Sequence, residues 1–186
     1  DIDFTVPKLY LYLNITDALN DRTNRRYDDN GIRGVDAAAK NDRLSYEVFE
    51  RACIKLKGIN NLHILTEPYD ANNLELSELI DIKKIVEAAY QFYDVTIIVT
   101  EKSIENHLTN TVLPMSDFYI AAVRPNTDEL RSSQRYMEYV KENFNIPNTK
   151  FKLIAYEYID KVSLPVSVIN RIFPGNIFMG CISYQK

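Results

Sequence analysis

The apolar positions of this chain follow two spacings in turn, and the alternation predicts helices separated by strands. Spacings of three and four residues predict helices at 42–57, 75–92 and 127–144, and a shorter helix that Ser163 caps, with Pro165 in its first turn. Short apolar or β-branched runs predict strands at 62–66, 94–100, 118–123, 150–158 and 177–183. Because strands alternate with helices, the predicted fold class is α/β, with a mostly parallel sheet flanked by helices.

One of these runs, Asp94 to Thr100, is β-branched and almost wholly apolar, which suits a strand buried on both faces of a parallel sheet. In such sheets, ligands bind outside the carboxyl ends of the strands. The sequence therefore predicts a site near Asp1–Asp3. The loops after Thr100, Val123 and Tyr158 are predicted to contribute to the same site.

The stretch at 20–34 is polar and charged and carries Asp28-Asp29-Asn30-Gly31, a composition typical of a mobile loop. No linker-like tract and no internal repeat divides the rest of the chain. With 186 residues, the chain is long enough for one domain with a substantial core. We therefore expect a single α/β domain over 1–186.

Composition argues against several classes of function. A formal net charge of −4 disfavours a general nucleic-acid-binding surface, and the local cluster of Arg22, Arg25 and Arg26 is typical of a solvated loop. No apolar run reaches the ~18 residues that a membrane span needs, and no signal peptide is visible. Cys53 and Cys181 lie far apart beside apolar residues, as buried reduced thiols do. These features predict a cytoplasmic protein.

The first four residues carry the clearest candidate chemistry. Asp1-Ile2-Asp3-Phe4 contains an acid-x-acid pair, and such a pair after a parallel strand is a place where nucleotide-binding α/β proteins hold magnesium and water. The chain has no Gly-rich phosphate loop with a lysine, so it reads as the back portion of a larger domain. His63 and His107 have no cysteine or carboxylate at metal-ligand spacing, and no separate metal site is expected there.

Short motifs follow one another along nearly the whole chain. They are Asp1-Ile2-Asp3-Phe4 with Leu9 and Leu13, Gly31-Ile32-Arg33-Gly34, Asn61-Leu62-His63-Ile64-Leu65, Phe92-Tyr93-Asp94 with Ile97-Ile98, Ser116-Asp117-Phe118-Tyr119-Ile120, and Val123-Arg124-Pro125-Asn126. In this order they resemble the deviant-Walker ATPases of the MinD/ParA group, which includes the CpaE/TadZ-type proteins of pilus assembly. The order, more than any single motif, carries the resemblance.

The resemblance implies a P-loop NTPase-like fold of the SIMIBI type whose N-terminal part is missing from this chain. It gives Asp3 a catalytic role, and of Asp1 and Asp3 one would lie on the magnesium shell while the other orients the attacking water. Nucleotide or magnesium contacts fall to Asp1, Asp3, Pro125 and Asn126, and the implied cofactors are ATP and magnesium. Such proteins dimerise across nucleotide and position an assembly such as a pilus, a secretion machine or a partitioning plasmid. Protein partners and a homodimer are therefore expected.

Three departures from the family's pattern bear on activity. Val99 stands where a Walker B-type Asp would follow Ile97-Ile98, and a valine cannot hold a magnesium-bound water. The strand at 150–158 runs through Ile154-Ala155-Tyr156-Glu157, without the Asn that reads the adenine edge. The phosphate loop is absent, so the chain would be an ATPase only if such a loop precedes Asp1. We therefore expect weak or no ATP hydrolysis.

Two other interpretations stay open. One is a non-catalytic pseudo-ATPase scaffold of the same fold, which recruits partners without hydrolysis. The other is a flavodoxin- or receiver-like binding module. Lys161 after a strand supports that module, whereas the lack of a well-placed Asp at a preceding strand end argues against it.

Overall fold

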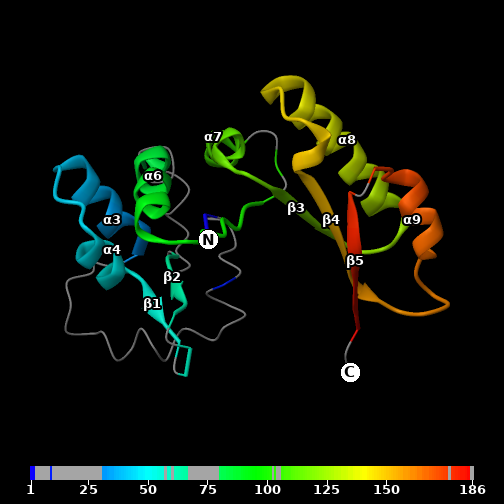
Figure 1. Ribbon diagram of the computed structural model, residues 1–186, viewed down its shortest axis with the longest axis horizontal. Coiled ribbons are helices and arrows are strands. Elements are labelled where there is room, and N and C mark those ends of the chain that lie inside the picture. The colour runs from blue at the N-terminus through cyan, green and yellow to red at the C-terminus, as the bar shows by residue number, and fades with distance from the viewer. Residues whose placement is uncertain are drawn as a thin grey trace. The chain divides into compact units, whose positions relative to one another are not determined.

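The computed structural model describes residues 1–2, 9, 31–56, 58–59, 61–66, 80–101, 103, 106–175 and 177–184 (Figure 1). The chain divides into two compact units, Asp1–Val112 and Leu113–Lys186. Asp3 and residues 20–30 of the predicted mobile loop lie outside the described residues. The predicted α/β fold class is confirmed, and the parallel sheet lies in the second unit.

The second unit is a parallel sheet with helical crossovers. Its elements are η2 (Leu113–Met115), β3 (Tyr119–Val123), α8 (Thr127–Phe144), η3 (Asn148–Lys150), β4 (Phe151–Tyr158), α9 (Val166–Ile172) and β5 (Phe178–Ser183). The strands are hydrogen-bonded in the order β3-β4-β5, and both pairs are parallel. α8 connects the first two strands and α9 the last two, as Figure 1 shows. The three predicted strands and the predicted long helix are confirmed to within one residue.

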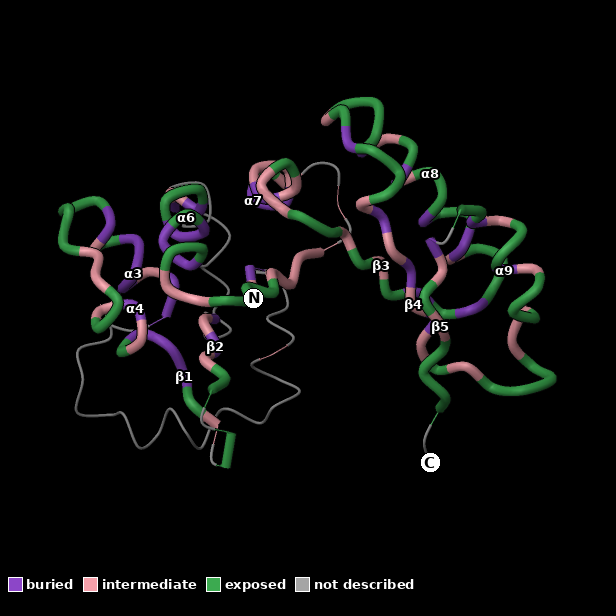
Figure 2. Tube along the Cα trace, viewed as in Figure 1, coloured by how far each residue is buried: buried purple, intermediate pink, exposed green. Residues whose placement is uncertain are grey.

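The core of the second unit lies between the helices and one face of the sheet. Phe151, Leu153 and Ala155 are buried and alternate with less buried neighbours along β4, which Figure 2 colours by burial. In the parallel register, Leu153 pairs with Ala121 on one side and with Phe178 on the other. The other buried members of this core are Val123, Leu130, Met137, Val140, Ile146, Ile169, Phe173 and Ile177.

Local capping decides where the two crossover helices begin. The sequence predicts Asn126 or Thr127 as the cap of α8, and it is the Asn126 side chain that accepts a hydrogen bond from Glu129 N–H (2.9 Å). For α9 the predicted cap is wrong, because the helix begins at Val166 directly after Pro165. The Ser163 hydroxyl instead accepts a hydrogen bond from Ile159 N–H (2.9 Å), which stabilises the loop before the helix.

The elements that the structure describes in the first unit are mostly helical. They are α3 (Gly31–Lys40), α4 (Tyr46–Ala52), β1 (Ile54–Lys55), β2 (His63–Ile64), α6 (Ile82–Phe92) and α7 (His107–Val112). α3 packs against α4 and α6, and α6 packs against α7. β1 and β2 form an antiparallel pair in which Ile54 lies opposite Ile64. The strand predicted at 62–66 is confirmed at its centre.

The helix predicted at 42–57 is wrong at both ends. Asp42 has φ +54 at the end of α3, and the Ser45 side chain then accepts a hydrogen bond from Val48 N–H (3.4 Å) to begin α4. At Cys53 the backbone becomes extended and enters β1. The apolar spacing continues through these breaks because it reflects which side chains are buried. The capping residues determine where the helix begins and ends.

The mobile loop predicted at 20–34 extends too far toward the C-terminus, because residues 31–34 are helical. Gly31 to Gly34 form the first turn of α3, and Ile32 is only 1% exposed. Gly31 has φ +68, a left-handed conformation that favours glycine. Gly31 therefore serves the entry into a buried helix.

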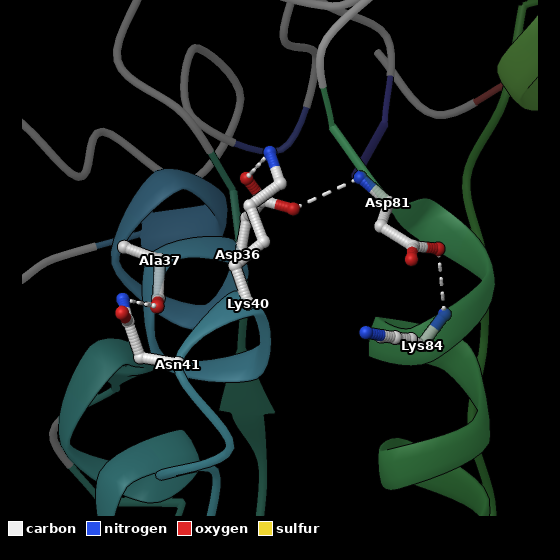
Figure 3. A network of polar contacts seen from close by, with 6 residues as sticks. All are labelled: Asp36, Ala37, Lys40, Asn41, Asp81 and Lys84. Atoms are coloured by element: carbon white, nitrogen blue, oxygen red, sulfur yellow. Dashed lines mark hydrogen bonds and ion pairs between the residues drawn. The ribbon is translucent and has the colours of Figure 1, made fainter.

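A buried carboxylate joins α3 to the start of α6 (Figure 3). Asp36 is 7% exposed, and its Oδ1 accepts a hydrogen bond from Asp81 N–H (2.9 Å). Its Oδ2 accepts one from Lys40 Nζ (2.6 Å). Asp81 itself accepts from Lys84 N–H (3.2 Å) and caps α6. The contact between Asp81 N–H and Asp36 thus joins the start of α6 to α3, and the other two contacts lie within α3 and within the first turn of α6.

The same cap corrects the helix predicted at 75–92. Residues 75–79 lie outside the described residues, and Ile80 is buried but not helical. The helix begins only at Ile82, because the Asp81 side chain satisfies a first-turn N–H from a non-helical backbone position.

The strand predicted at 94–100 is not formed. The segment has no strand partner among the described residues, and the side chains of Val95 and Ile97 are 76% and 81% exposed. Ile2 N–H donates a backbone hydrogen bond to Val99 C=O in this segment (3.0 Å). β-branched composition favours a strand, but a strand also needs a hydrogen-bonded neighbour along its length.

Candidate functional site

The beginning of the chain lies beside the end of the segment at 94–100. Ile2 donates its N–H to Val99 C=O (3.0 Å), and the Ile2 side chain is 6% exposed. The Asp1 nitrogen donates to Leu65 C=O (2.8 Å), one residue past β2. Asp1 and Ile2 therefore each contact the end of another segment, Leu65 and Val99.

The Asp1 carboxylate has a structural contact of its own. Its Oδ2 accepts a hydrogen bond from Leu9 N–H (2.8 Å), and the residue is half-buried. Asp3, the predicted catalytic residue, lies outside the described residues, as do Phe4 and Leu13. Of the predicted acid pair, the structure thus places Asp1 alone.

Glu101 is an acid that the sequence analysis missed, and it lies two residues past Val99. Its Oε1 accepts a hydrogen bond from Asn106 Nδ2 (2.5 Å). The same Asn106 side chain accepts from Leu108 N–H (2.9 Å) and Thr109 N–H (3.1 Å) at the start of α7. Sequence reasoning could have found Glu101 as a carboxylate just after Val99, the position where this chain lacks the acid of the family pattern.

These acids do not make a metal site by themselves. No three histidine, cysteine or acidic side chains come together at ligand geometry in the part of the chain that the structure describes. Asp1 already accepts a backbone N–H, and Glu101 is held by Asn106. Magnesium is commonly bound by one or two carboxylates together with substrate phosphates, so the described residues fit a magnesium ion only through a nucleotide.

Pro125 and Asn126 belong to the second unit, whereas Asp1 belongs to the first. Pro125 C=O accepts a hydrogen bond from Leu164 N–H (3.0 Å), and Asn126 caps α8. Both therefore fix the loop at the carboxyl end of β3.

A second feature that the sequence analysis missed lies next to this loop. Arg124 Nε donates to Glu157 Oε2 (2.7 Å), and the Arg124 guanidinium lies 5.5 Å from the centroid of the Tyr156 ring. The hydrogen bond that Arg124 donates to Glu157 raises the pKa of Arg124, so the guanidinium stays charged. Glu157 has φ +54, and the strand register is irregular between Ala155 and Tyr158. An ion pair thus occupies the strand end where the family pattern has an Asn.

Comparison with solved structures finds a protein of similar fold. The chain is similar to a ParA family ATPase from Chlorobium tepidum TLS, with a TM-score of 0.69 and 18% sequence identity, over 84% of this chain and 62% of that protein. The chain has a ParA-like fold. It spans less than two thirds of that protein's length. No protein-family profile and no curated protein matches the sequence.

This similarity confirms the predicted ParA-like fold. Membership of the CpaE/TadZ subgroup stays a prediction. No helix in the described ranges is long and apolar enough to cross a membrane.

A polar cluster within the ParA-like fold surrounds His63, for which the sequence predicts an ordinary core position. His63 Nδ1 lies 2.8 Å from Tyr93 Oη, and His63 Nε2 lies 3.7 Å from Glu50 Oε1. Burial, and after it the nearby Cys53, raises the pKa of the Tyr93 hydroxyl far above its ordinary value. The hydroxyl therefore stays protonated, and it ties β2 to the end of α6.

Replacing Tyr93 with phenylalanine is expected to lower the free energy of unfolding by about 1–3 kcal/mol, because the Nδ1 atom of His63 loses its hydrogen-bond partner in a largely buried place. The ring would keep its contact with Phe49, whose centroid lies 5.7 Å away. Urea denaturation measures the change. Tyr46→Phe is the control, since the Tyr46 hydroxyl is exposed and 3.4 Å from Glu50. An equal loss in both variants would contradict a special role for the His63 contact.

Proposed function

We propose that this chain is a MinD/ParA-like domain that acts as a spatial organiser or assembly factor, with weak or no ATP hydrolysis. Its work would be to bind protein partners, in a pilus, secretion or partition machinery of the cytoplasm, and to form a homodimer. The ParA-like fold supports this class, and it gives no support to a flavodoxin- or receiver-like module.

The observation that carries the proposal is the neighbourhood of Val99. The Val99 carbonyl accepts a hydrogen bond from Ile2 N–H. Val99, an apolar residue, therefore lies directly beside Asp1-Ile2. The family pattern has an acid there, and an acid would share the magnesium and the attacking water with the first pair. A valine supplies neither a ligand nor a proton acceptor, so efficient hydrolysis would lack one of its parts.

In the strictest form of this proposal, the chain is a scaffold of the same fold that does not hydrolyse ATP at all. The Arg124–Glu157 pair favours it, because an ion pair lies near the end of β4, the strand that lacks the Asn expected to read adenine. ATP and magnesium remain proposed cofactors. Asp1, Asp3, Pro125 and Asn126 remain the proposed residues for binding them, with Asp3 as the proposed catalytic residue.

Phosphate release from ATP by the full-length protein, with magnesium, tests the proposal. We expect wild type to release phosphate no faster than Asp3→Ala, because the catalytic set already lacks the acid at Val99. Thermal unfolding with and without magnesium and ATP reports binding separately, since a ligand that binds the folded state raises the melting temperature. A drop of about tenfold or more in turnover on Asp3→Ala, or about 1.4 kcal/mol in the barrier, would show an active ATPase and contradict the proposal.

A further inference from the structure

We propose that residues 94–100 pair with the same residues of a second copy of this chain, as two antiparallel strands about a two-fold axis at Ile97. The inference rests on the proposed function in one respect, since it names the surface through which the proposed homodimer forms. Its starting point is the segment whose composition predicts a strand, but which forms none in the structure.

This segment lies between α6 and α7 and presents apolar side chains to solvent (Figure 1). Ile97 is 81% exposed, more than any other large apolar side chain in the described ranges, and Val95 is 76% exposed. Residues 94–100 carry one charge, at Asp94, and contain neither proline nor glycine. An exposed segment of high β propensity and low charge favours pairing with a strand of another chain.

The contact with Ile2 indicates which edge of the segment a second strand would use. In an extended backbone, the N–H and C=O groups of successive residues point to opposite edges. Val99 C=O accepts a hydrogen bond from Ile2 N–H (3.0 Å), so the backbone groups of Thr96 and Ile98 belong to the edge away from Ile2. A strand that pairs with Thr96 and Ile98 therefore leaves the contact with Ile2 intact.

The alternation of hydrogen bonds then selects one register. About a two-fold axis at Ile97, Thr96 lies opposite Ile98 of the second copy, and these two residues exchange backbone hydrogen bonds across the shared edge. Ile97 lies opposite Ile97 of the second copy in the close, non-hydrogen-bonded pair, and Val95 lies opposite Val99. This register pairs all seven residues of the segment with one another and places apolar side chains together.

Charge favours the antiparallel arrangement over a parallel one. A parallel pair in register would place the two Asp94 carboxylates side by side, and like charges in that position destabilise a pair of strands. In the antiparallel pair, Asp94 lies opposite Thr100, and the two carboxylates are about 20 Å apart at about 3.4 Å per residue. Pairing about a two-fold axis also closes at two copies, which gives a dimer and no fibre.

Light scattering of the full-length protein without nucleotide tests this dimer. We expect Ile97→Lys to weaken dimerisation by at least about tenfold, because two like charges replace an apolar pair on the axis. Val162→Lys is the matched control. Val162 is 78% exposed and lies in the second unit, so the same change there should leave the dimer unchanged.

A disulfide across the axis gives a positive readout. The Cα atoms of a non-hydrogen-bonded antiparallel pair lie about 4.5 Å apart, within the range that a disulfide spans. Ile97→Cys should therefore give a disulfide-linked dimer on mild oxidation. The experiment is made with Cys181→Ser, because Cys181 is an exposed free thiol. Val162→Cys with the same Cys181→Ser change is the control and should remain mostly unlinked.

Each outcome decides the inference. A dimer that Ile97→Lys leaves unchanged, no disulfide in Ile97→Cys, or a monomer in the absence of nucleotide would overturn it. Amide exchange identifies the alternative, since protection of residues 94–100 in a monomer would mean that another segment of the full-length protein covers them.

Failure of the inference differs from failure of the proposed function. A dimer that forms only with ATP would overturn the pairing and leave the proposed function intact. Fast turnover that depends on Asp3 would contradict the proposed function without touching the pairing. Melting temperatures of the variants confirm that the substitutions leave the fold unchanged.

Discussion

Replacing Leu153 with alanine is expected to lower the free energy of unfolding by about 3–5 kcal/mol, among the larger losses for a single substitution. Leu153 is 0% exposed and lies at the centre of β4, between Ala121 and Phe178 on the neighbouring strands. The removed atoms lose their transfer free energy, and the cavity that they leave cannot collapse because strands flank it on both sides. Urea denaturation followed by far-UV circular dichroism measures the loss.

Met179→Ala in the neighbouring strand is the matched control for Leu153→Ala. Met179 lies in β5 of the same sheet and is 59% exposed, so we expect a change below about 1 kcal/mol. A small loss for Leu153→Ala, or equal losses for the two variants, would mean that the centre of β4 is not the core of the second unit.

The second unit follows from signals that are local in sequence. The β-branched and aromatic runs of β3, β4 and β5 each lie between turn-forming residues, and Asn126 marks the start of α8 by its own side chain. The connections are helices of suitable length, so parallel pairing is almost the sole arrangement that such a chain permits. Sequence reasoning therefore predicts these elements to within a residue.

The errors in the predicted helices of the first unit have one physical source. Ser45 and Asp81 lie inside stretches whose apolar spacing is continuous, yet each side chain caps a helix and breaks the stretch at that point. The failed strand at 94–100 has a different cause. Its composition is that of a strand, but whether a strand forms depends on distant segments that supply hydrogen bonds, which no window of sequence contains.

The candidate site is harder to predict because its contacts join distant parts of the chain. Arg124 and Glu157 are 33 residues apart, and no spacing rule brings them together. Ile2 and Val99 meet through backbone atoms, which carry no sequence signal at all. The sequence predicts a site at the carboxyl ends of the strands, from the geometry of parallel sheets, and that site stays a prediction.

Replacing Asp36 with alanine is expected to lower the free energy of unfolding by about 1–3 kcal/mol, because the Asp81 N–H would lose its acceptor in a buried place. Figure 3 shows why this carboxylate matters: it lies on α3 and binds the backbone just before α6. Urea denaturation measures the overall loss. Amide hydrogen exchange should show the largest loss of protection in the first turn of α6.

Two further variants separate the contacts that Asp36 makes. Lys40→Met removes the ion pair but keeps the bond to Asp81, and Lys40 is 47% exposed, so its loss should stay below about 1 kcal/mol. Asp36→Asn keeps an oxygen that can accept from Asp81 N–H, so it should retain most of the protection of α6. If Lys40→Met were as costly as Asp36→Ala, the ion pair would be the main contact. The link from α3 to α6 would then be a consequence of packing, and the carboxylate would not be what fixes the start of α6.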